Sequence, residues 1–277
     1  MTRNLPLDLE LVTPAVGAIL GGIDLRKTLD AETVQAIRQA VLEHGVIFFR
    51  EQDLSRNEMA DFMLNFGVPC NDPFSRGEQF APAEKTILDM PTLAYSRATA
   101  VWHYDSSLAP EPASLMALRA IELPPSGGDT CWGNMYAAYD ALSAPLRKML
   151  DGLHAEHTAF KVLPLMGYTG DGLKNDLRTI HPVIRVHPET GRKALFVNEL
   201  WTERIVDLEP AESAHVLALL FEHVKSPLFT VRWRWRVNDL ALWDNRAFQH
   251  YAVRDYEARR VLQKSLVAGD RPYGPKA

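Results

Sequence analysis

The stretch FTVRWRWR at residues 229–236 constrains the fold more than any other segment of the chain. One set of alternate positions is apolar and the other is polar: Phe229, Val231, Trp233 and Trp235 against Thr230, Arg232, Arg234 and Arg236. Successive side chains of a β-strand point to opposite faces, so this strict alternation predicts a strand with one aromatic face and one charged face.

Other segments predict further strands and a few helices. Strands are expected within 9–24, 46–50, 114–122, 240–244 and 260–268, and a hairpin is expected over 183–198. Helices are expected after Asp30 up to Gly45, after the S-x-x-E capping box of Ser55 and Glu58 up to Gly67, over 143–150 and over 210–224. Loops are expected over 67–85 and 161–180, the second as a lid or a disordered tip. Many strands with few helices favour a β-sandwich or barrel with peripheral helices.

The chain lacks internal repeats, low-complexity segments and linkers rich in Pro and Gly, so we expect one domain over residues 1–277. A net charge of −5 argues against a nucleic-acid partner, which selects a basic surface. The two cysteines, Cys70 and Cys131, do not make a disulfide framework. With no apolar leader and no long apolar run, we expect a cytoplasmic protein without a membrane span.

The segment VWHYDSSLAP at 101–110 places an imidazole and a carboxylate two residues apart. In a strand His103 and Asp105 point the same way and can reach one metal ion from one side. The competing interpretation is a surface turn, because H-x-D is a common chance pattern. A second imidazole would complete a two-His, one-carboxylate set, which suits non-haem Fe(II).

His250 is the strongest candidate for that imidazole because it follows the buried segment LALWD at 240–244. His181, before Pro182, is ambiguous. Solvated or capping roles are expected for the remaining histidines. His187 lies in the expected hairpin turn. The others lie in or near helical patterns: His44, His154, His157, His215 and His223. Arg260 could bind the far carboxylate of a keto-acid co-substrate, although a surface charge at a strand end is the alternative.

Taken together, the ordered segments resemble the taurine dioxygenase/2,4-D dioxygenase (TauD/TfdA) family of Fe(II)- and 2-oxoglutarate-dependent dioxygenases. The similar segments are WHYD (102–105), GGDTCW (127–132), HPVIRVHPETGRKALFVN (181–198), RWRW (232–235) and WDNRAFQHYAVRDY (243–256). They cover most of the chain after residue 100, and GAILGGIDL (17–25) and GVIFFREQ (45–52) match more loosely.

The resemblance implies a mainly β fold with peripheral helices, the double-stranded β-helix (jelly roll, cupin-like). It implies His103, Asp105 and His250 as iron ligands, and Thr130 and Arg260 as contacts of 2-oxoglutarate. The implied enzyme is an oxidoreductase that consumes O2 and 2-oxoglutarate, releases succinate and CO2, and hydroxylates a small molecule. Asp105 favours hydroxylation over halogenation, since halogenating relatives replace this carboxylate.

The position of Arg260 departs from the family pattern, because it lies ten residues after His250, one fewer than in the pattern. A one-residue deletion within 254–258 explains this difference, and Arg259 is the alternative arginine. Strand parity favours Arg260, which shares a face with Leu262 and Lys264.

The resemblance also bears on the substrate. Lys264 stands where taurine-specific relatives have a second arginine, and Asp72, Ser75 and Thr99 replace their other polar contacts. Taurine is therefore not the expected substrate. We expect an acidic one (a sulfonate, sulfate ester, carboxylate or amino-acid-like compound) with Lys264, Asp72, Phe160 and Trp201 in the pocket. Core packing is the alternative for Phe160, Trp201 and Phe74.

Three alternatives stay open: another oxidative outcome such as desaturation, a metal-dependent jelly-roll enzyme that does not use oxygen, and a degenerate binding protein. Thr130 and Arg260 argue against the second alternative, which needs no keto-acid contact. Family members are commonly dimers or tetramers, so the resemblance implies a homo-oligomer.

Overall fold

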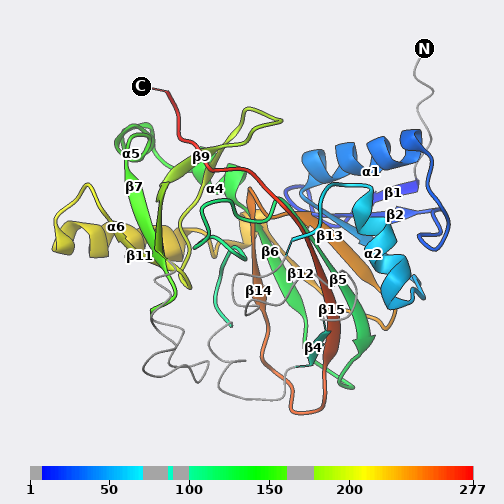
Figure 1. Ribbon diagram of the computed structural model, residues 1–277. Coiled ribbons are helices and arrows are strands. Elements are labelled where there is room, and N and C mark those ends of the chain that lie inside the picture. The colour runs from blue at the N-terminus through cyan, green and yellow to red at the C-terminus, as the bar shows by residue number, and fades with distance from the viewer. Residues whose placement is uncertain (1–7, 71–86, 90–99, 161–177, 277) are drawn as a thin grey trace.

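The computed structural model describes residues 8–70, 87–89, 100–160 and 178–276 (Figure 1). Its largest sheet has seven strands in the order β1-β2-β3-β13-β5-β15-β4. Their bounds, in the same order, are Asp8–Leu11, Ala18–Gly21, Val46–Phe49, Leu240–Asp244, Leu115–Glu122, Val261–Val267 and Ile87–Asp89. Within this sheet β2 and β3 run parallel and the other neighbours pair antiparallel.

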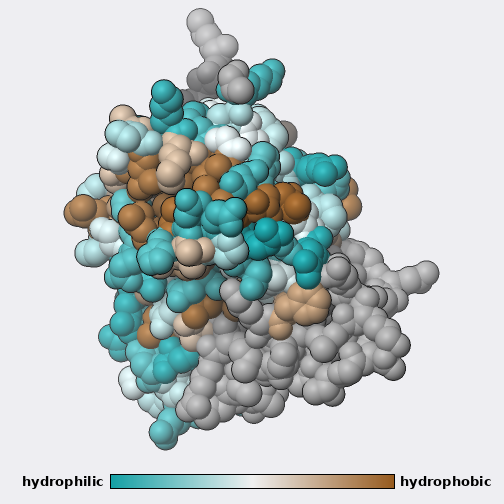
Figure 2. Space-filling view, turned by 90° about the vertical axis from the view of Figure 1, so that its left-hand side faces the viewer, coloured by the Kyte–Doolittle hydropathy of each residue, from teal (hydrophilic) through white to brown (hydrophobic). Residues whose placement is uncertain are grey.

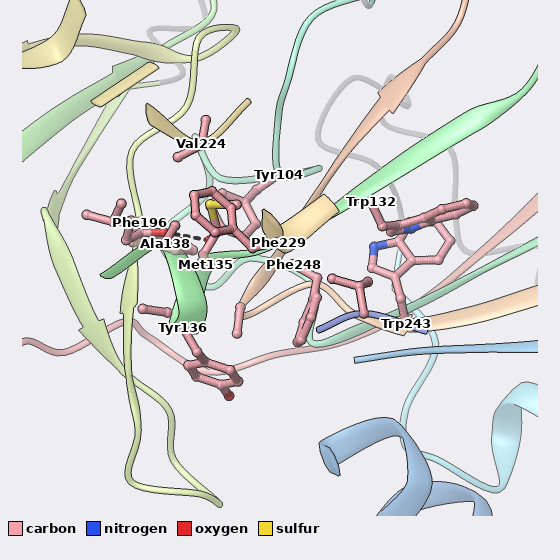
Figure 3. Close-up of a cluster of buried hydrophobic side chains, with 14 of the residues drawn as sticks. Tyr104, Trp132, Met135, Tyr136, Ala138, Phe196, Val224, Phe229, Trp243 and Phe248 are labelled. Carbon is pink, nitrogen blue, oxygen red and sulfur yellow. Dashed lines mark hydrogen bonds between the residues drawn. The ribbon is translucent and has the colours of Figure 1, made fainter. Parts of the chain in front are cut away.

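A second sheet, in the order β12-β6-β14, packs against one face of the large sheet. Its strands are Thr230–Trp233, Thr130–Asn134 and Phe248–Ala252. Phe48 of β3 stacks on Trp233 of β12, with 3.8 Å between ring centroids. Trp132 of β6 lies 5.6 Å from Trp243 of β13, and Figure 3 shows this pair. The two packed sheets form the jelly roll that the sequence predicts.

The opposite face of the large sheet is covered by two helices, α1 (Ala31–His44) and α2 (Arg56–Leu64) (Figure 1). Both faces of the central strands are therefore buried, and their alternate residues divide between two cores. In β13, Trp243 faces the second sheet, whereas Leu242 packs with Ile37 of α1 and Phe62 of α2. This explains why β3 and β13 are continuous apolar runs in the sequence.

Both helices begin at the predicted caps. The Asp30 carboxylate accepts a hydrogen bond from the backbone N–H of Thr33, and Ser55 and Glu58 form the reciprocal capping box. Gly45 ends α1 with φ +80°, and a Cβ there would lie 2.1 Å from the ring of Phe248. Two features therefore require glycine at this position: the positive backbone angle and the close approach of the Phe248 ring.

The remaining elements pack around α6 (Pro210–His223), mostly toward the left of Figure 1, and share a hydrophobic core with the second sheet. They include a sheet in the order β11-β7-β8 and a hairpin of β9 and β10. These strands are Thr202–Ile205, His154–Thr158, Arg178–Pro182, Ile184–Val186 and Lys193–Leu195, and the other helices are α4 (Met135–Asp140), α5 (Ala144–Leu150) and the 3-10 turn η2 (Pro227–Phe229). Figure 2 shows the face on this side, where apolar side chains lie among hydrophilic ones.

The structure corrects several local predictions. The segment with His154 and His157 is the strand β7, not part of a helix; His154 is exposed, whereas Glu156, His157 and Thr158 are buried. Residues 178–180 of the expected loop 161–180 belong to β8, and residues 161–177 lie outside the described part. The FTVRWRWR strand covers only Thr230–Trp233, although all four of its predicted apolar residues are buried.

Candidate metal and co-substrate site

Two histidines far apart in the sequence face each other at the end of the second sheet. His103 and His250 form an isolated antiparallel bridge. The N–H of each residue donates to the carbonyl of the other, at 3.0 and 2.9 Å. Residues paired in this way send their side chains to the same face, and the two imidazole centroids lie 4.1 Å apart.

Asp105 completes this cluster. Its Oδ1 lies 3.4 Å from His103 Nε2, and one ligand atom from each of His103, Asp105 and His250 lies within 4.8 Å of the others. Tyr104, between the two ligand candidates, points the other way into the core. There it packs on Phe196 and donates its hydroxyl to the Leu195 carbonyl (Figure 3). The segment is an isolated bridge followed by a turn and not the expected strand, yet both groups lie on one side, as the sequence predicts.

The protonation states suit a metal ligand set. His103 Nδ1 lies 2.7 Å from the Val101 carbonyl, so this nitrogen carries a hydrogen and Nε2 is the nitrogen that faces Asp105. Burial, with the neighbouring His103, lowers the pKa of His250 to about 3. Burial would raise the pKa of Asp105, but Lys264 and the two imidazoles hold it well below its ordinary value. At neutral pH His250 is thus a neutral imidazole and Asp105 a carboxylate, as metal ligands must be.

Asn245 fixes the backbone of Asp105. Its Oδ1 accepts from the Asp105 N–H at 3.2 Å, and its Nδ2 donates to the carbonyls of Asp105 and Ala113 at 3.0 and 2.9 Å. Trp201 adds a hydrogen bond from its indole to the Tyr104 carbonyl at 3.0 Å. The role of Asn245 was not predicted from the sequence, although its place directly after the buried strand β13 was an available signal.

The turn after Asp105 rests on a buried polar network. The Ser107 hydroxyl lies 3.1 Å from His157 Nδ1 and accepts from Asn198 Nδ2 at 3.0 Å. His181 Nε2 lies 3.0 Å from the carbonyl of Ala109. Burial lowers the pKa of His181 to about 4, and it lowers the pKa of His157 well below the ordinary range. Both histidines are thus neutral structural groups, contrary to the solvated role expected for His157.

Thr130 at the start of β6 and Arg260 directly before β15 come together in space. Arg260 is 7% exposed, and its guanidinium donates to the Gly128 carbonyl at 2.9 Å and to Thr130 Oγ1 at 3.2 Å. Burial lowers the pKa of Arg260, and the described residues give it no carboxylate within ion-pair distance. A buried guanidinium without an anion is costly, so this arrangement suits an anionic ligand.

The loop before Thr130 is fixed by charged groups that were not predicted from the sequence. The Gly128 N–H donates to the Asp255 carboxylate at 2.8 Å, and Arg232 bridges Asp129 and Asp255. Arg259, the alternative to Arg260, is exposed and pairs with Glu122 at 2.8 Å. Arg260 is buried and Arg259 is exposed, which agrees with the strand parity that favoured Arg260.

The structure places only some of the expected substrate contacts near the ligand cluster. Lys264 joins the cluster, with its ammonium 3.5 Å from Asp105 Oδ2, whereas Asp72, Phe74, Ser75 and Thr99 lie outside the described residues. Phe160 is 42% exposed, and the guanidinium of Arg178 lies over its ring. Trp201 is buried and supports Tyr104. Among the described residues, only Lys264 of this group contacts a ligand candidate.

The donor set determines which metal fits. Two imidazoles and one carboxylate on one side leave positions open for further ligands, and this is the arrangement of non-haem Fe(II) oxygenases. A structural zinc site would be closed by a fourth protein ligand, and the cluster found among the described residues has three. The residues present therefore fit an iron centre that also binds a chelating co-substrate.

Comparison with known proteins agrees with this geometry. A profile of the family described as "Taurine catabolism dioxygenase TauD, TfdA family" matches residues 8–266. An alpha-ketoglutarate-dependent sulfate ester dioxygenase of Pseudomonas putida is 36% identical over 98% of this chain and 92% of its own length. The alpha-ketoglutarate-dependent 2,4-dichlorophenoxyacetate dioxygenase of Cupriavidus pinatubonensis is 35% identical over 93% and 96%.

Solved structures show the same fold. A taurine dioxygenase from Burkholderia xenovorans superposes with a TM-score of 0.83 at 37% identity and covers 97% of this chain and 91% of its own. AAD-2 in complex with Mn(II) and N-oxalylglycine superposes with a TM-score of 0.82 at 27% identity, with coverage of 96% and 98%. On these matches and on the jelly roll with its two-histidine, one-carboxylate cluster, the chain belongs to the TauD, TfdA family of dioxygenases.

Proposed function

We propose that this chain is an Fe(II)- and 2-oxoglutarate-dependent dioxygenase that hydroxylates a small acidic organic substrate and releases succinate and CO2. Family membership and the alpha-ketoglutarate-dependent relatives support the reaction class. The observation that carries the proposal is the His103–His250 bridge, which brings both imidazoles and the Asp105 carboxylate into one cluster within 4.8 Å.

Each residue has a defined part in this proposal. His103, Asp105 and His250 hold the iron, which with 2-oxoglutarate and O2 supplies the oxidant for a C–H bond. Thr130 and the Arg260 guanidinium bind the far carboxylate of 2-oxoglutarate, since a planar fork of donors suits a carboxylate. Asn245 keeps Asp105 in place, and the buried aromatic residues around Tyr104 exclude water from one side of the cluster.

The substrate is proposed to be an anion because the Lys264 ammonium stands at the cluster. The relatives act on sulfate esters and on 2,4-dichlorophenoxyacetate, and an alkylsulfatase of Acinetobacter baylyi is 34% identical over 95% of this chain. We therefore place sulfate esters first, followed by sulfonates, carboxylates and amino-acid-like compounds, with taurine itself disfavoured. Asp72, Phe160 and Trp201 stay predicted pocket residues, although the hydrogen bond of Trp201 favours a supporting role.

Oxygen uptake that depends on 2-oxoglutarate tests this function. The enzyme with Fe(II) is offered an alkyl sulfate, an alkylsulfonate, an aryloxyacetate, an amino acid and an uncharged alcohol, with and without 2-oxoglutarate. We expect uptake, with succinate formed, for at least one anion and only when 2-oxoglutarate is present. Oxygen uptake with the uncharged alcohol alone would contradict the proposal of an acidic substrate. No uptake with any of these compounds would contradict the substrate classes proposed here.

Three further features belong to the same proposal. We propose that residues 1–277 are one dioxygenase domain, a view supported by a family match over 8–266. We also propose a cytoplasmic location, from the sequence, and a homo-oligomer (dimer or tetramer), from the family. No helix in the described ranges is long and apolar enough to span a membrane. Light scattering that shows a monomer at working concentration would contradict the homo-oligomer.

A further inference from the structure

Lys264 stands at the outer oxygen of the central carboxylate. Its Nζ lies 3.5 Å from Asp105 Oδ2, whereas Oδ1 of the same carboxylate faces His103 Nε2 at 3.4 Å. Both side chains are mostly buried, with exposed fractions of 12% for Lys264 and 15% for Asp105. The two oxygens of Asp105 thus face different partners, one an ammonium and the other an imidazole.

Charges at this depth are weakly screened by solvent, so the Lys264 charge acts on anything bound at Asp105. A divalent cation held by Asp105 would be repelled by this ammonium. A dianionic chelator on the same cation would be attracted by it.

We propose that Lys264 couples metal binding to co-substrate binding: its ammonium opposes the divalent metal alone and favours the metal together with the dianionic keto acid. This inference rests on the proposed function, because it takes Asp105 as a metal ligand. Lys264 is then a positioning residue of the metal centre in addition to its proposed contact with an anionic substrate.

A thermodynamic cycle tests the coupling without turnover. The Kd of Mn(II) is measured by the electron paramagnetic resonance signal of free Mn(II), with and without saturating N-oxalylglycine, and in the absence of substrate. The ratio of the two Kd values is the coupling factor. For Lys264→Met we expect Mn(II) alone to bind as tightly as in the wild type or more tightly, and the coupling factor to fall roughly tenfold.

Three further variants separate charge from structure. Lys264→Gln is a second neutral variant in case Lys264→Met does not fold, and Lys264→Arg keeps the charge and should keep most of the coupling. Lys193→Met is the matched control, because Lys193 also pairs with an aspartate, Asp151 at 2.7 Å, but outside the ligand cluster. We expect wild-type coupling in Lys193→Met.

The outcomes are distinguishable. A wild-type coupling factor in both neutral variants, or an equal loss of both Mn(II) affinities, would overturn the inference and leave the proposed function standing. A wild-type protein that does not bind Mn(II), or whose bound Mn(II) does not recruit N-oxalylglycine, would overturn both. A reduced coupling factor in the neutral variants alone supports the inference.

Discussion

Asn245 shows how a single amide determines the position of a ligand candidate. Its three hydrogen bonds join the backbone of Asp105 to the Ala113 carbonyl, two residues before β5. Asp244, directly before it, is held by Arg246 and by His187 at 3.0 Å, so the clamp is itself anchored in a buried ionic network. The Asp105 carboxylate is therefore held both through its backbone and through Lys264.

Replacing Asn245 by alanine tests this clamp. The change leaves the Asp105 N–H and two carbonyls without a side-chain partner, so we expect the free energy of unfolding to fall by about 1–3 kcal/mol. Mn(II) affinity should fall roughly 10- to 100-fold, as for other groups that orient metal ligands. Asn65→Ala is the control, since Asn65 Nδ2 bonds only α2 backbone carbonyls. Equal Mn(II) affinity in the two variants would contradict the clamp.

Adjacent arginines give a matched pair for the co-substrate site. Arg260→Met removes the buried guanidinium that meets Thr130, and we expect 2-oxoglutarate affinity to fall by at least about tenfold, because a buried charge pair loses one partner. Arg259→Met removes an exposed guanidinium paired with Glu122 and should change that affinity little. Calorimetric titration of the Mn(II)-loaded variants measures both affinities. A larger loss of 2-oxoglutarate affinity in Arg259→Met would show that Arg259, and not Arg260, contacts the co-substrate.

At the scale of elements, β7 and β8 bring His157 and His181 beneath the turn that follows Asp105. Their ring centroids lie 5.3 Å apart, and each imidazole is buried. Protonation of either group would place a charge in a site that offers no carboxylate among the contacts described for them. These strands are therefore expected to be sensitive to acid.

The pH dependence of stability tests that expectation. The pKa of His181 is about 4 in the folded state against the ordinary 6.5, so the unfolded chain binds more protons between these values. Stability is complete above pH 6.5 and falls as the pH drops toward 4, by on the order of 3 kcal/mol from this histidine. Urea unfolding of wild type and His181→Gln at pH 7 and pH 4.5 measures the difference. If the wild type and His181→Gln lose equal free energy of unfolding between these pH values, His181 does not cause the loss.

Elements with a local signal could be predicted from the sequence. Helices α1 and α2 have caps and apolar periodicity, and β3, β5, β12, β13 and β15 have apolar runs or alternation. The strands β6, β7 and β14 were not predicted, because their buried faces carry Thr, His, Glu or Gln. Such residues are stabilised inside the protein by hydrogen bonds to distant segments, as Gln249 is by the Val197 carbonyl.

The candidate site divides in the same way. The spacing of His103 and Asp105 was enough to predict that they share a face, and the position of His250 after a buried segment made it the strongest candidate for their partner. Assigning it as a ligand and placing Arg260 beside Thr130 needed the family resemblance. The contacts made by Asn245, Asp255 and Lys264 are tertiary. They depend on how β5, β13 and β15 align, and no local pattern of the sequence determines that.

At the scale of the whole molecule, an aromatic layer joins the two sheets that position the site. Phe48 of the large sheet is fully buried between Trp132 and Trp233 of the second sheet. Because Thr130 and His250 lie in the second sheet and Arg260 adjoins the large one, the site is complete only while the sheets stay packed.

Phe48→Ala tests this dependence. We expect the free energy of unfolding to fall by about 3–5 kcal/mol, through lost contacts and the cavity left behind. Leu228→Ala, at a side chain that is 82% exposed, should change it by less than about 0.5 kcal/mol. Urea unfolding measures both variants, and a small loss in Phe48→Ala would mean that the sheets are held together by other contacts.

The proposed function requires that His103, Asp105 and His250 hold an iron ion that 2-oxoglutarate chelates. The most direct measurement is the visible spectrum after anaerobic addition of Fe(II) and 2-oxoglutarate to the wild type and to His250→Ala. We predict a weak metal-to-ligand charge-transfer band in the wild type and its loss in the variant. A wild type without the band, or a variant that keeps it at wild-type affinity, would contradict the claim.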